Sequence, residues 1–382
     1  MNFRPYLDFI RFAIGSLPDV PGSAKEIGWA DFFEFCLRQG IVGIVFDGVE
    51  RSGLTVPREV LFQWIGIVEN IKATNLMLDQ RSEKMSHFWE SRGYRSCILK
   101  GQANATMYPK PQLRSPGDID IWVDEPKCLE VNVEKIIQIA RSKAPDGLFS
   151  LHHVTMPVYD DTSVEVHYRP VFLDNWWKDR KLQKYINKVR DAQFGNEITL
   201  SDGASKVNRL TDEFNAVFLL LHMWHHLLST RNNLKQLIDY YYLLKSLTPS
   251  PSPKGEGSDF QSLFKQFGVL KYARGIMWIE HAALGLEEHY LLVEPDEKIG
   301  RLLLNETMHY GEKPEQKQGR LKILVNRITD NLTLFRQFPS PVLIAPAYLV
   351  WHQWWKLKTS HKLKHSSGAD KWDELHKVNT EL

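Results

Sequence analysis

Cysteine is scarce in this chain, and an excess of either charge is absent. The 382 residues include only three cysteines, Cys36, Cys97 and Cys128, and no two of them have the spacing of a metal-binding or disulfide pair. This pattern excludes a zinc ribbon or a disulfide framework and fits a reducing compartment. The 48 basic and 46 acidic residues leave a formal charge of +2, so the net charge implies no nucleic-acid partner.

Long apolar runs are lacking as well. No stretch stays apolar over the roughly 20 residues that a membrane-spanning helix needs. Residues 1–18 carry Arg4, Asp8 and Arg11 inside their apolar pattern, which is unlike a signal peptide. We therefore expect a soluble cytoplasmic protein without a transmembrane segment. A chain of 382 residues is long enough for two or three domains, each with a sizeable core.

The first quarter of the chain is predicted to be helical. Apolar residues recur at helical spacing between residues 4 and 94. Pro57 suits the first position of a long helix that runs toward Trp89. No catalytic constellation is visible in this region, so we interpret it as a helical part that supports a neighbouring sheet.

A strand-like segment at residues 118–123 carries the first candidate site. Polar and apolar residues alternate there, so Asp118 and Asp120 point to one side while Ile119 and Ile121 point into a core. Adjacent carboxylates on one face repel each other unless a cation lies between them. Mg²⁺ prefers oxygen ligands and often shares them with substrate phosphates, so this pair is a candidate magnesium site. The alternative is a solvated sheet edge.

The segment before this strand suits phosphate binding. Residues 96–99 are strand-like, Lys100 and Gly101 follow, and residues 102–107 suit a short helix. A glycine at such a turn lets backbone N–H groups approach phosphate oxygens at the positive end of the helix dipole. Arg114, in a loop stiffened by three prolines, is a candidate phosphate clamp. Alternatively, Lys100 caps the strand end and Arg114 pairs with a neighbouring acid.

Two further strands are predicted at residues 151–158 and 163–168, on either side of a polar turn. A helical pattern at residues 126–144 precedes them. In the second strand, Glu165 and His167 lie on the same face. The alternative for Glu165 is the solvated face of a half-buried strand, and His167 is interpreted as a structural neighbour of the site rather than a general base.

A histidine cluster lies on a helix predicted at residues 212–229. His222 and His226 are one turn apart on a shared face, and His225 lies beside His222. The next predicted helix carries Asp239. These histidines could pack in a core, contact a substrate or hold zinc, but the glutamate of a metalloprotease helix does not follow His222.

The remaining segments carry weaker signals. Helical patterns cover residues 176–194, 260–286, 299–308 and 321–334, and short strands are predicted at residues 197–200 and 206–210. Residues 249–258 are rich in proline, serine and glycine, which is typical of a flexible linker or loop. Pro339, Pro341 and Pro346 are expected to break the chain before an aromatic and basic tail. That tail could touch a membrane surface or a partner, or pack as a C-terminal helix.

In combination, these motifs resemble a known family. Similarity to the uncharacterised nucleotidyltransferase family, within the DNA polymerase β-like superfamily, rests on Leu99-Lys100-Gly101, Tyr108-Pro109, Arg114 and Asp118-Ile119-Asp120. The resemblance implies an α+β fold with a small mixed β-sheet nucleotidyltransferase core, an N-terminal helical region and a C-terminal helical lobe. It also implies a third carboxylate on a later strand, which Glu165 matches. Gln102 departs from the family pattern, in which Ser or Gly is usual.

From the resemblance we expect domains at residues 1–94, 95–210 and 211–382. The expected reaction is Mg²⁺-dependent transfer of a nucleoside monophosphate from an NTP, such as ATP, to a hydroxyl acceptor with release of pyrophosphate. Three carboxylates, Asp118, Asp120 and Glu165, would bind two metal ions, with Mn²⁺ as a substitute.

Two further groups of residues complete the expected site. The expected nucleotide contacts are Lys100, Gly101, Gln102 and Arg114, and the expected acceptor-side or supporting residues are His167, His222, His225, His226 and Asp239. The acceptor could be a small molecule, a protein side chain or an RNA end, and the sequence leaves the oligomeric state open. The alternative function is a non-catalytic or toxin-like protein that keeps the fold and binds a nucleotide.

Overall fold

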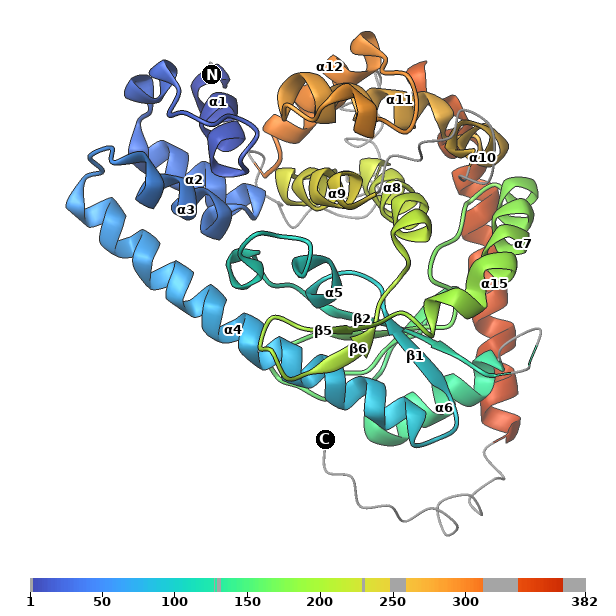
Figure 1. Ribbon diagram of the computed structural model, residues 1–382. Coiled ribbons are helices and arrows are strands. Elements are labelled where there is room, and N and C mark those ends of the chain that lie inside the picture. Colours follow the sequence, from blue (N-terminus) through green and yellow to red (C-terminus); the bar gives the residue numbers. More distant parts are fainter. Residues whose placement is uncertain are drawn as a thin grey trace. The chain divides into compact units, whose positions relative to one another are not determined.

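The computed structural model describes residues 3–126, 128, 132–228, 231–247, 259–311 and 336–366 (Figure 1). The chain divides into two compact units, and each unit is assembled from separate segments. The first comprises Met1–Leu76, Asn104–Pro116 and Asp212–Gln337, and the second comprises Met77–Ala103, Gly117–Thr211 and Phe338–Leu382. The three-part division expected from the sequence stays a prediction. The expected linker at 249–258 and helix at 321–334 lie outside the described residues.

The first unit is built from helices. They are α1 (Arg4–Ala13), α2 (Trp29–Gln39), α3 (Val42–Ser52), the first part of α4 (Arg58–Glu90), α8 (Asp212–Leu228), α9 (Leu234–Ser246), α10 (Phe260–Phe267), α11 (Leu270–Trp278) and α12 (Glu297–Met308), with 3₁₀ turns at η1 (Gly22–Glu26), η2 (Pro111–Leu113) and η4 (Glu288–Tyr290). Helix α4 begins directly after Pro57, as predicted, because proline has no N–H to donate and its backbone angle suits a helix start. Fully buried rings such as Phe9, Phe32 and Trp64 form the core of the N-terminal helices.

Glu280 is buried in this unit. It lies in η3 (Ile279–Ala283), a π-helical turn that continues α11. Its side chain is fully buried, and neither carboxylate oxygen has a hydrogen-bond partner within the described part of the chain. Burial raises the pKa of this carboxyl well above its usual 4.5, because the charged form loses its hydration.

Glu280→Gln is therefore expected to stabilise the protein as the pH rises. Above pH 4.5 the unfolded chain loses this proton while the folded protein retains it, so the free energy of unfolding falls with pH. The amide does not titrate and removes this decline. Melting curves across the range from pH 4.5 to mildly alkaline should diverge, with the variant melting a few degrees higher at the alkaline end. Glu288 is exposed, so Glu288→Gln is the control. If Glu280→Gln and wild type lose melting temperature equally as the pH rises, or if Glu288→Gln gains as much, Glu280 is not a buried protonated carboxyl.

The second unit contains a small mixed sheet. Its strands are β1 (Arg95–Ile98), β2 (Ile119–Asp124), β3 (His153–Thr155) and β4 (Val164–His167), in the spatial order β1-β2-β4-β3. Strand β2 pairs in parallel with β4, and the other two pairings are antiparallel. A mixed sheet of this size with helical segments before and after it confirms the predicted α+β class.

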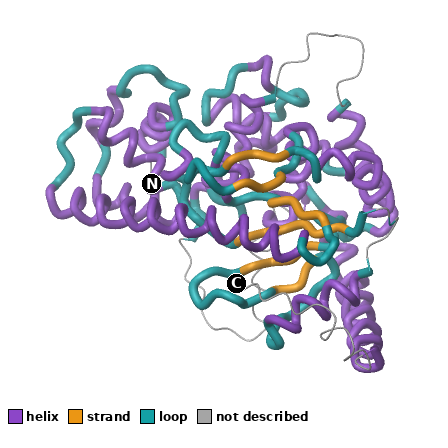
Figure 2. Tube along the Cα trace, turned by 60° about the horizontal axis from the view of Figure 1, so that its bottom comes forward, coloured by secondary structure: helices purple, strands orange, loops and turns teal. Residues whose placement is uncertain are grey.

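The two faces of this sheet differ in chemistry. Ile119, Ile121 and Val166 point into a buried cluster with residues of α6 (Val133–Lys143) and the last part of α4, and both helices cover this face (Figure 2). The opposite face carries Asp120 beside Glu165, which are paired in the β2–β4 register. The period-two alternation predicted for β2 is therefore confirmed, because Ile119 and Ile121 belong to the core.

Apart from α15, the other elements of the second unit lie near their predicted places. They are α5 (Gln102–Ala105, which also enters the first unit), α7 (Trp176–Gln193), the hairpin of β5 (Glu197–Thr199) and β6 (Lys206–Asn208), and α15 (Pro339–Ser366). Helix α6 begins at Val133, later than predicted, with the side chain of Asn132 as its N-terminal cap. None of the helices within the described ranges is both long and apolar enough to cross a bilayer.

The predicted break at the C-terminal prolines is wrong. Helix α15 begins at Pro339 and runs through Pro341 and Pro346. The first two prolines lie in the first turn, where backbone N–H groups have no partner within the helix, so they remove no hydrogen bond there. Trp355 of α15 packs against the core of the second unit, in contact with Phe149 at a ring-centroid distance of 6.0 Å. This packing favours the expectation of a packed C-terminal helix.

Candidate functional site

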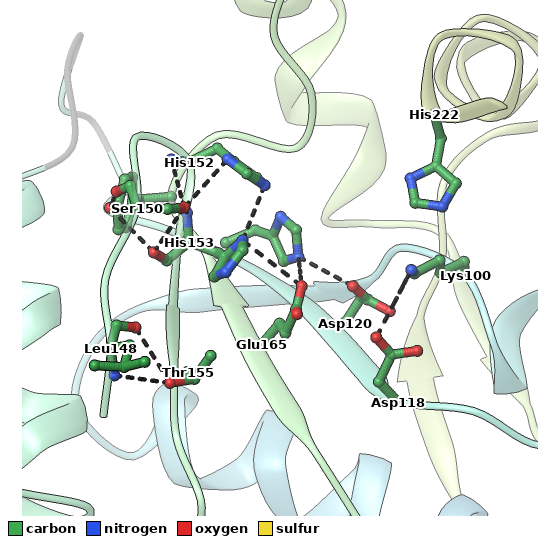
Figure 3. A network of polar contacts seen from close by, with 12 residues as sticks. Lys100, Asp118, Asp120, Leu148, Ser150, His152, His153, Thr155, Glu165 and His222 are labelled. Atoms are coloured by element: carbon green, nitrogen blue, oxygen red, sulfur yellow. Dashed lines mark hydrogen bonds and ion pairs between the residues drawn. The ribbon is translucent and has the colours of Figure 1, made fainter. Parts of the chain in front are cut away.

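Two aspartates of the second unit share one cation from their own chain. Asp118 directly precedes β2, Asp120 lies within it, and Lys100 follows β1, the strand antiparallel to β2. The Lys100 Nζ lies 3.2 Å from Asp120 Oδ2 and 3.9 Å from Asp118 Oδ2 (Figure 3). The Asp120 side chain is 1% exposed, whereas that of Asp118 is 40% exposed. The repulsion that the sequence predicted is thus relieved by an ammonium group.

Lys100 stays charged in this position. Burial alone would lower its pKa, but the carboxylates of Asp120, Asp118 and Glu165 together outweigh that effect and raise it. The site therefore holds a positive charge where a metal ion would also be favoured.

Strand β4 adds an acid and an imidazole to this face. The His167 Nε2 lies 3.1 Å from Asp120 Oδ1 and 3.5 Å from Glu165 Oε2. Burial would lower the pKa of His167, but its hydrogen bonds to Asp120 and Glu165 raise it to about 9. Burial would raise the pKa of Glu165, but His167 and His153 lower it. Asp120, Glu165 and His167 each offer a ligand atom within 4.8 Å of the others, so these three could hold a metal ion.

Asp118 is linked to Asp120, Glu165 and His167 by Lys100, which contacts both aspartates. Within the described ranges it belongs to neither of the two compact sets of metal-ligating atoms. The expected ligand set of Asp118, Asp120 and Glu165 stays a prediction, which requires the carboxylate of Asp118 to turn inward when a cation binds.

Two histidines next to this group were missed by sequence reasoning. His153 opens β3, where it is paired directly with His167 of β4. Its Nδ1 lies 2.9 Å from His152 Nε2 and 3.6 Å from Glu165 Oε2 (Figure 3). Burial lowers the pKa of His153 despite the facing Glu165 carboxylate, so its imidazole is neutral at neutral pH. The available signal was a His-His pair at the start of a strand predicted to neighbour the strand of Glu165.

The turn between Lys100 and α5 depends on glycine. Gly101 has a φ of +62°, which side-chain-bearing residues rarely adopt, and a Cβ there would lie 3.3 Å from the Asp118 carbonyl oxygen. Helix α5 is a single turn of four residues, too short to provide the predicted helix dipole. The Gln102 amide donates to Asp79 Oδ1 at 2.5 Å, and Asp79 also accepts from Ser201. Gln102 therefore holds the turn in place, through a buried aspartate that the sequence did not indicate.

Gly101→Ala is expected to cost stability and displace Asp118. The left-handed backbone costs a side-chain-bearing residue roughly 1–2 kcal/mol, and the added methyl group presses on the Asp118 carbonyl. Gly93→Ala is the matched control, because Gly93 also has a positive φ but has open space around it. Chemical denaturation should show a larger loss for Gly101→Ala. Equal losses in the two variants would mean that the contact with Asp118 is unimportant.

Arg114 is paired with Asp239 inside the first unit. The Arg114 Nε donates to Asp239 Oδ1 and its Nη2 donates to Oδ2, each at 2.7 Å. The Tyr108 hydroxyl also donates to Asp239 Oδ1, at 2.5 Å. Burial would raise the pKa of Asp239, but Arg114 lowers it. This geometry favours the alternative reading of Arg114 as the partner of an acid. Phosphate binding by Arg114 stays a prediction and would require it to share or leave this pair.

The histidine cluster lies on α8 in the first unit. The His222 and His226 Nε2 atoms lie 3.0 Å apart, and the His222 ring stacks on Phe218. On the next helix, both carboxylate oxygens of Asp239 already accept hydrogen bonds from Tyr108 or Arg114. An acceptor-side role for His222, His225 and His226 stays a prediction.

The chain is similar to known nucleotidyltransferase-like proteins. A family model described as "Uncharacterised nucleotidyltransferase" matches residues 25–285, which is more than half of the chain. No curated protein matches the sequence. One similar solved structure is described as "Crystal structure of an antigenic nucleotidyltransferase-like protein from Paracoccidioides brasiliensis". It is 15% identical with a TM-score of 0.33, and the match covers 56% of this chain and 93% of that one.

Proposed function

Because this chain belongs to the uncharacterised nucleotidyltransferase family, we propose that it transfers a nucleoside monophosphate from an NTP to a hydroxyl acceptor and releases pyrophosphate. One observation carries the proposal within the family. Asp118 and Asp120 lie together at the start of the core strand β2, and among the described residues the charge recorded between them is the ammonium of Lys100. Such a pair is well suited to exchange that ammonium for a hard divalent cation and a phosphate chain.

The donor set fits Mg²⁺. Asp118, Asp120 and Glu165 provide carboxylate oxygens, the ligands that Mg²⁺ prefers. When bound there, one or two such ions would polarise the α-phosphate and lower the pKa of the attacking hydroxyl. His167 would donate from Nε2 to Asp120 and Glu165 and so keep both carboxylates oriented.

The remaining residues would position the substrates. Lys100, released from the aspartates when a cation arrives, would neutralise the triphosphate, and the Gly101 turn would let the backbone approach it. Gln102 and Arg114 would act mainly by holding their own segments through Asp79 and Asp239.

The acceptor side is proposed to involve histidines and an aspartate. The expected residues are His222, His225, His226 and Asp239, and the acceptor is a hydroxyl of a small molecule, protein or RNA. A cytoplasmic location belongs to the proposal and is supported by three cysteines that are all free thiols.

A nucleotide-binding protein without activity is the competing function, and one observation favours it. Lys100 already neutralises Asp118 and Asp120, so a tightly held ammonium would exclude the metal. Such a protein would bind NTP weakly in Mg²⁺ and transfer nothing.

The test uses NTPs labelled at the α- or the γ-phosphate, with Mg²⁺ and cell extract. Nucleotidyl transfer moves the α-label, but not the γ-label, into an acceptor fraction and releases labelled pyrophosphate from the γ-labelled substrate. Wild-type protein with EDTA serves as the control. Transfer of the γ-label would indicate a kinase, and binding without transfer of either label would favour the competing function.

A further inference from the structure

Three imidazoles converge at the edge of the sheet formed by β3 and β4. His152, His153 and His167 each place a ring nitrogen within 4.8 Å of the others. The β3–β4 register sets His153 directly opposite His167, so backbone pairing itself brings two of the three rings together. Glu165, two residues before His167, faces the same side of β4.

Three measured separations between neighbouring ligand atoms are close to those found around a bound metal ion. A metal–nitrogen bond of about 2.0–2.1 Å places neighbouring ligand atoms roughly 3.3 Å apart. The successive separations are 2.9 Å from His152 Nε2 to His153 Nδ1, then 3.6 Å to Glu165 Oε2. Glu165 Oε2 lies 3.5 Å from His167 Nε2, so this carboxylate lies next to the group of three imidazoles.

Contacts with Ser150 orient the His152 ring. The Ser150 hydroxyl lies 3.3 Å from His152 Nδ1, which favours a proton on that nitrogen and directs Nε2 toward His153. Ser150 is itself held by its backbone, because its carbonyl accepts from the Tyr168 hydroxyl and its N–H donates to the His153 carbonyl (Figure 3 shows Ser150 beside both histidines). Metal-binding histidines are commonly oriented by contacts of this kind.

We propose that His152, His153, His167 and Glu165 form a binding site for a divalent transition-metal ion of the Zn²⁺ class. Three nitrogens and one carboxylate oxygen match the ligands of Zn²⁺ and Co²⁺, whereas Mg²⁺ prefers an all-oxygen set. Binding replaces the hydrogen bond between His152 and His153, and the proton of that bond moves, by exchange with solvent, to the other nitrogen of the neutral His153 ring. Coordination through His167 Nε2 also replaces its hydrogen bonds to Asp120 and Glu165, and the proton of that imidazolium is released to solvent. The site differs from the aspartate site in its ligands and needs no transfer activity. The two share only Glu165 and His167.

The experiment titrates metal-free protein with Zn²⁺ by calorimetry in the absence of Mg²⁺, because Glu165 belongs to both ligand sets. Titration with Co²⁺ then reports geometry, because tetrahedral Co²⁺ absorbs visible light strongly. One equivalent should bind with a tetrahedral spectrum. His152→Ala and His153→Ala should each weaken binding by a hundredfold or more, and Ser150→Ala by about tenfold.

The controls separate this site from its surroundings. His289→Ala removes an exposed imidazole in η4 and should leave binding unchanged. Asp118→Asn should also bind Zn²⁺ normally, even if it abolishes transfer. If His153→Ala melts at a much lower temperature than wild type, His153→Gln keeps the size of the side chain and should still lose the ion. Binding that survives the His152 and His153 substitutions, or the absence of a tetrahedral Co²⁺ spectrum, would overturn the proposal.

Discussion

Asp118→Asn should lower nucleotidyl transfer by on the order of a hundredfold or more while leaving the fold intact. The amide keeps the shape of the side chain but loses the charge that a divalent cation needs. Asp118 is 40% exposed and its contact with Lys100 is long, at 3.9 Å, so little stability depends on it. The measurements are transfer of the α-label under saturating NTP and a melting curve.

Asp120→Asn should lose as much activity and also lose stability. The buried carboxylate faces Lys100 on one side and His167 on the other, and both are held in their charged forms. Removing its charge leaves two cations with less compensation in a site shielded from water. Asp160→Asn, on the exposed turn before β4, is the matched control for loss of one carboxylate. Full nucleotidyl transfer by Asp118→Asn would contradict the assignment of Asp118 to a metal site.

Breaking the Arg114–Asp239 pair should give the largest loss of stability of any single change to the polar residues discussed. Both side chains are almost fully buried, and two hydrogen bonds of 2.7 Å join them. Arg114→Ala or Asp239→Ala leaves an uncompensated buried charge, which typically costs about 3–5 kcal/mol. Urea denaturation at neutral pH measures this loss directly.

A double variant separates a structural role of Arg114 from a phosphate-binding role. Arg114→Met with Asp239→Leu removes both charges and fills similar volume, so much of the lost stability should return. NTP binding by the double variant then decides the role. Retained affinity assigns Arg114 to packing, and affinity lost from a stable protein restores the phosphate clamp. If the double variant is no more stable than the single ones, the pair does not act as a compensated unit.

Local pattern was enough to predict the elements that carry the aspartates. Alternation over residues 118–123 predicts both the strand and the face of Asp120, because side-chain direction in a strand depends only on the parity of the position. The start of α4 after Pro57 is equally local. Pro339 and Pro341 of α15 show the limit of such rules, because a proline in the first turn of a helix removes no hydrogen bond.

Contacts between distant segments could not be predicted in this way. Arg114 and Asp239 are 125 residues apart, and no periodicity links a loop arginine to one acid among many. The meeting of His153 with His167 depends on the register of β3 against β4, where a shift of one residue would turn His153 to the other face. The family resemblance indicated a catalytic sheet, but the neighbours of each carboxylate required three-dimensional structure.

The segmented make-up of the two units has a consequence for synthesis. The chain passes from one unit to the other at residues 76/77, 103/104, 116/117, 211/212 and 337/338, so neither unit is a continuous stretch. On the ribosome, the N-terminal helices emerge long before α8, α9 and α12, which belong to the same unit, and the sheet emerges long before α15. Large loops must close before either core is complete, and loop closure of that length is slow. The nascent chain therefore exposes apolar surface, which later segments will cover, until its last third has been made. Chaperones are needed in this situation.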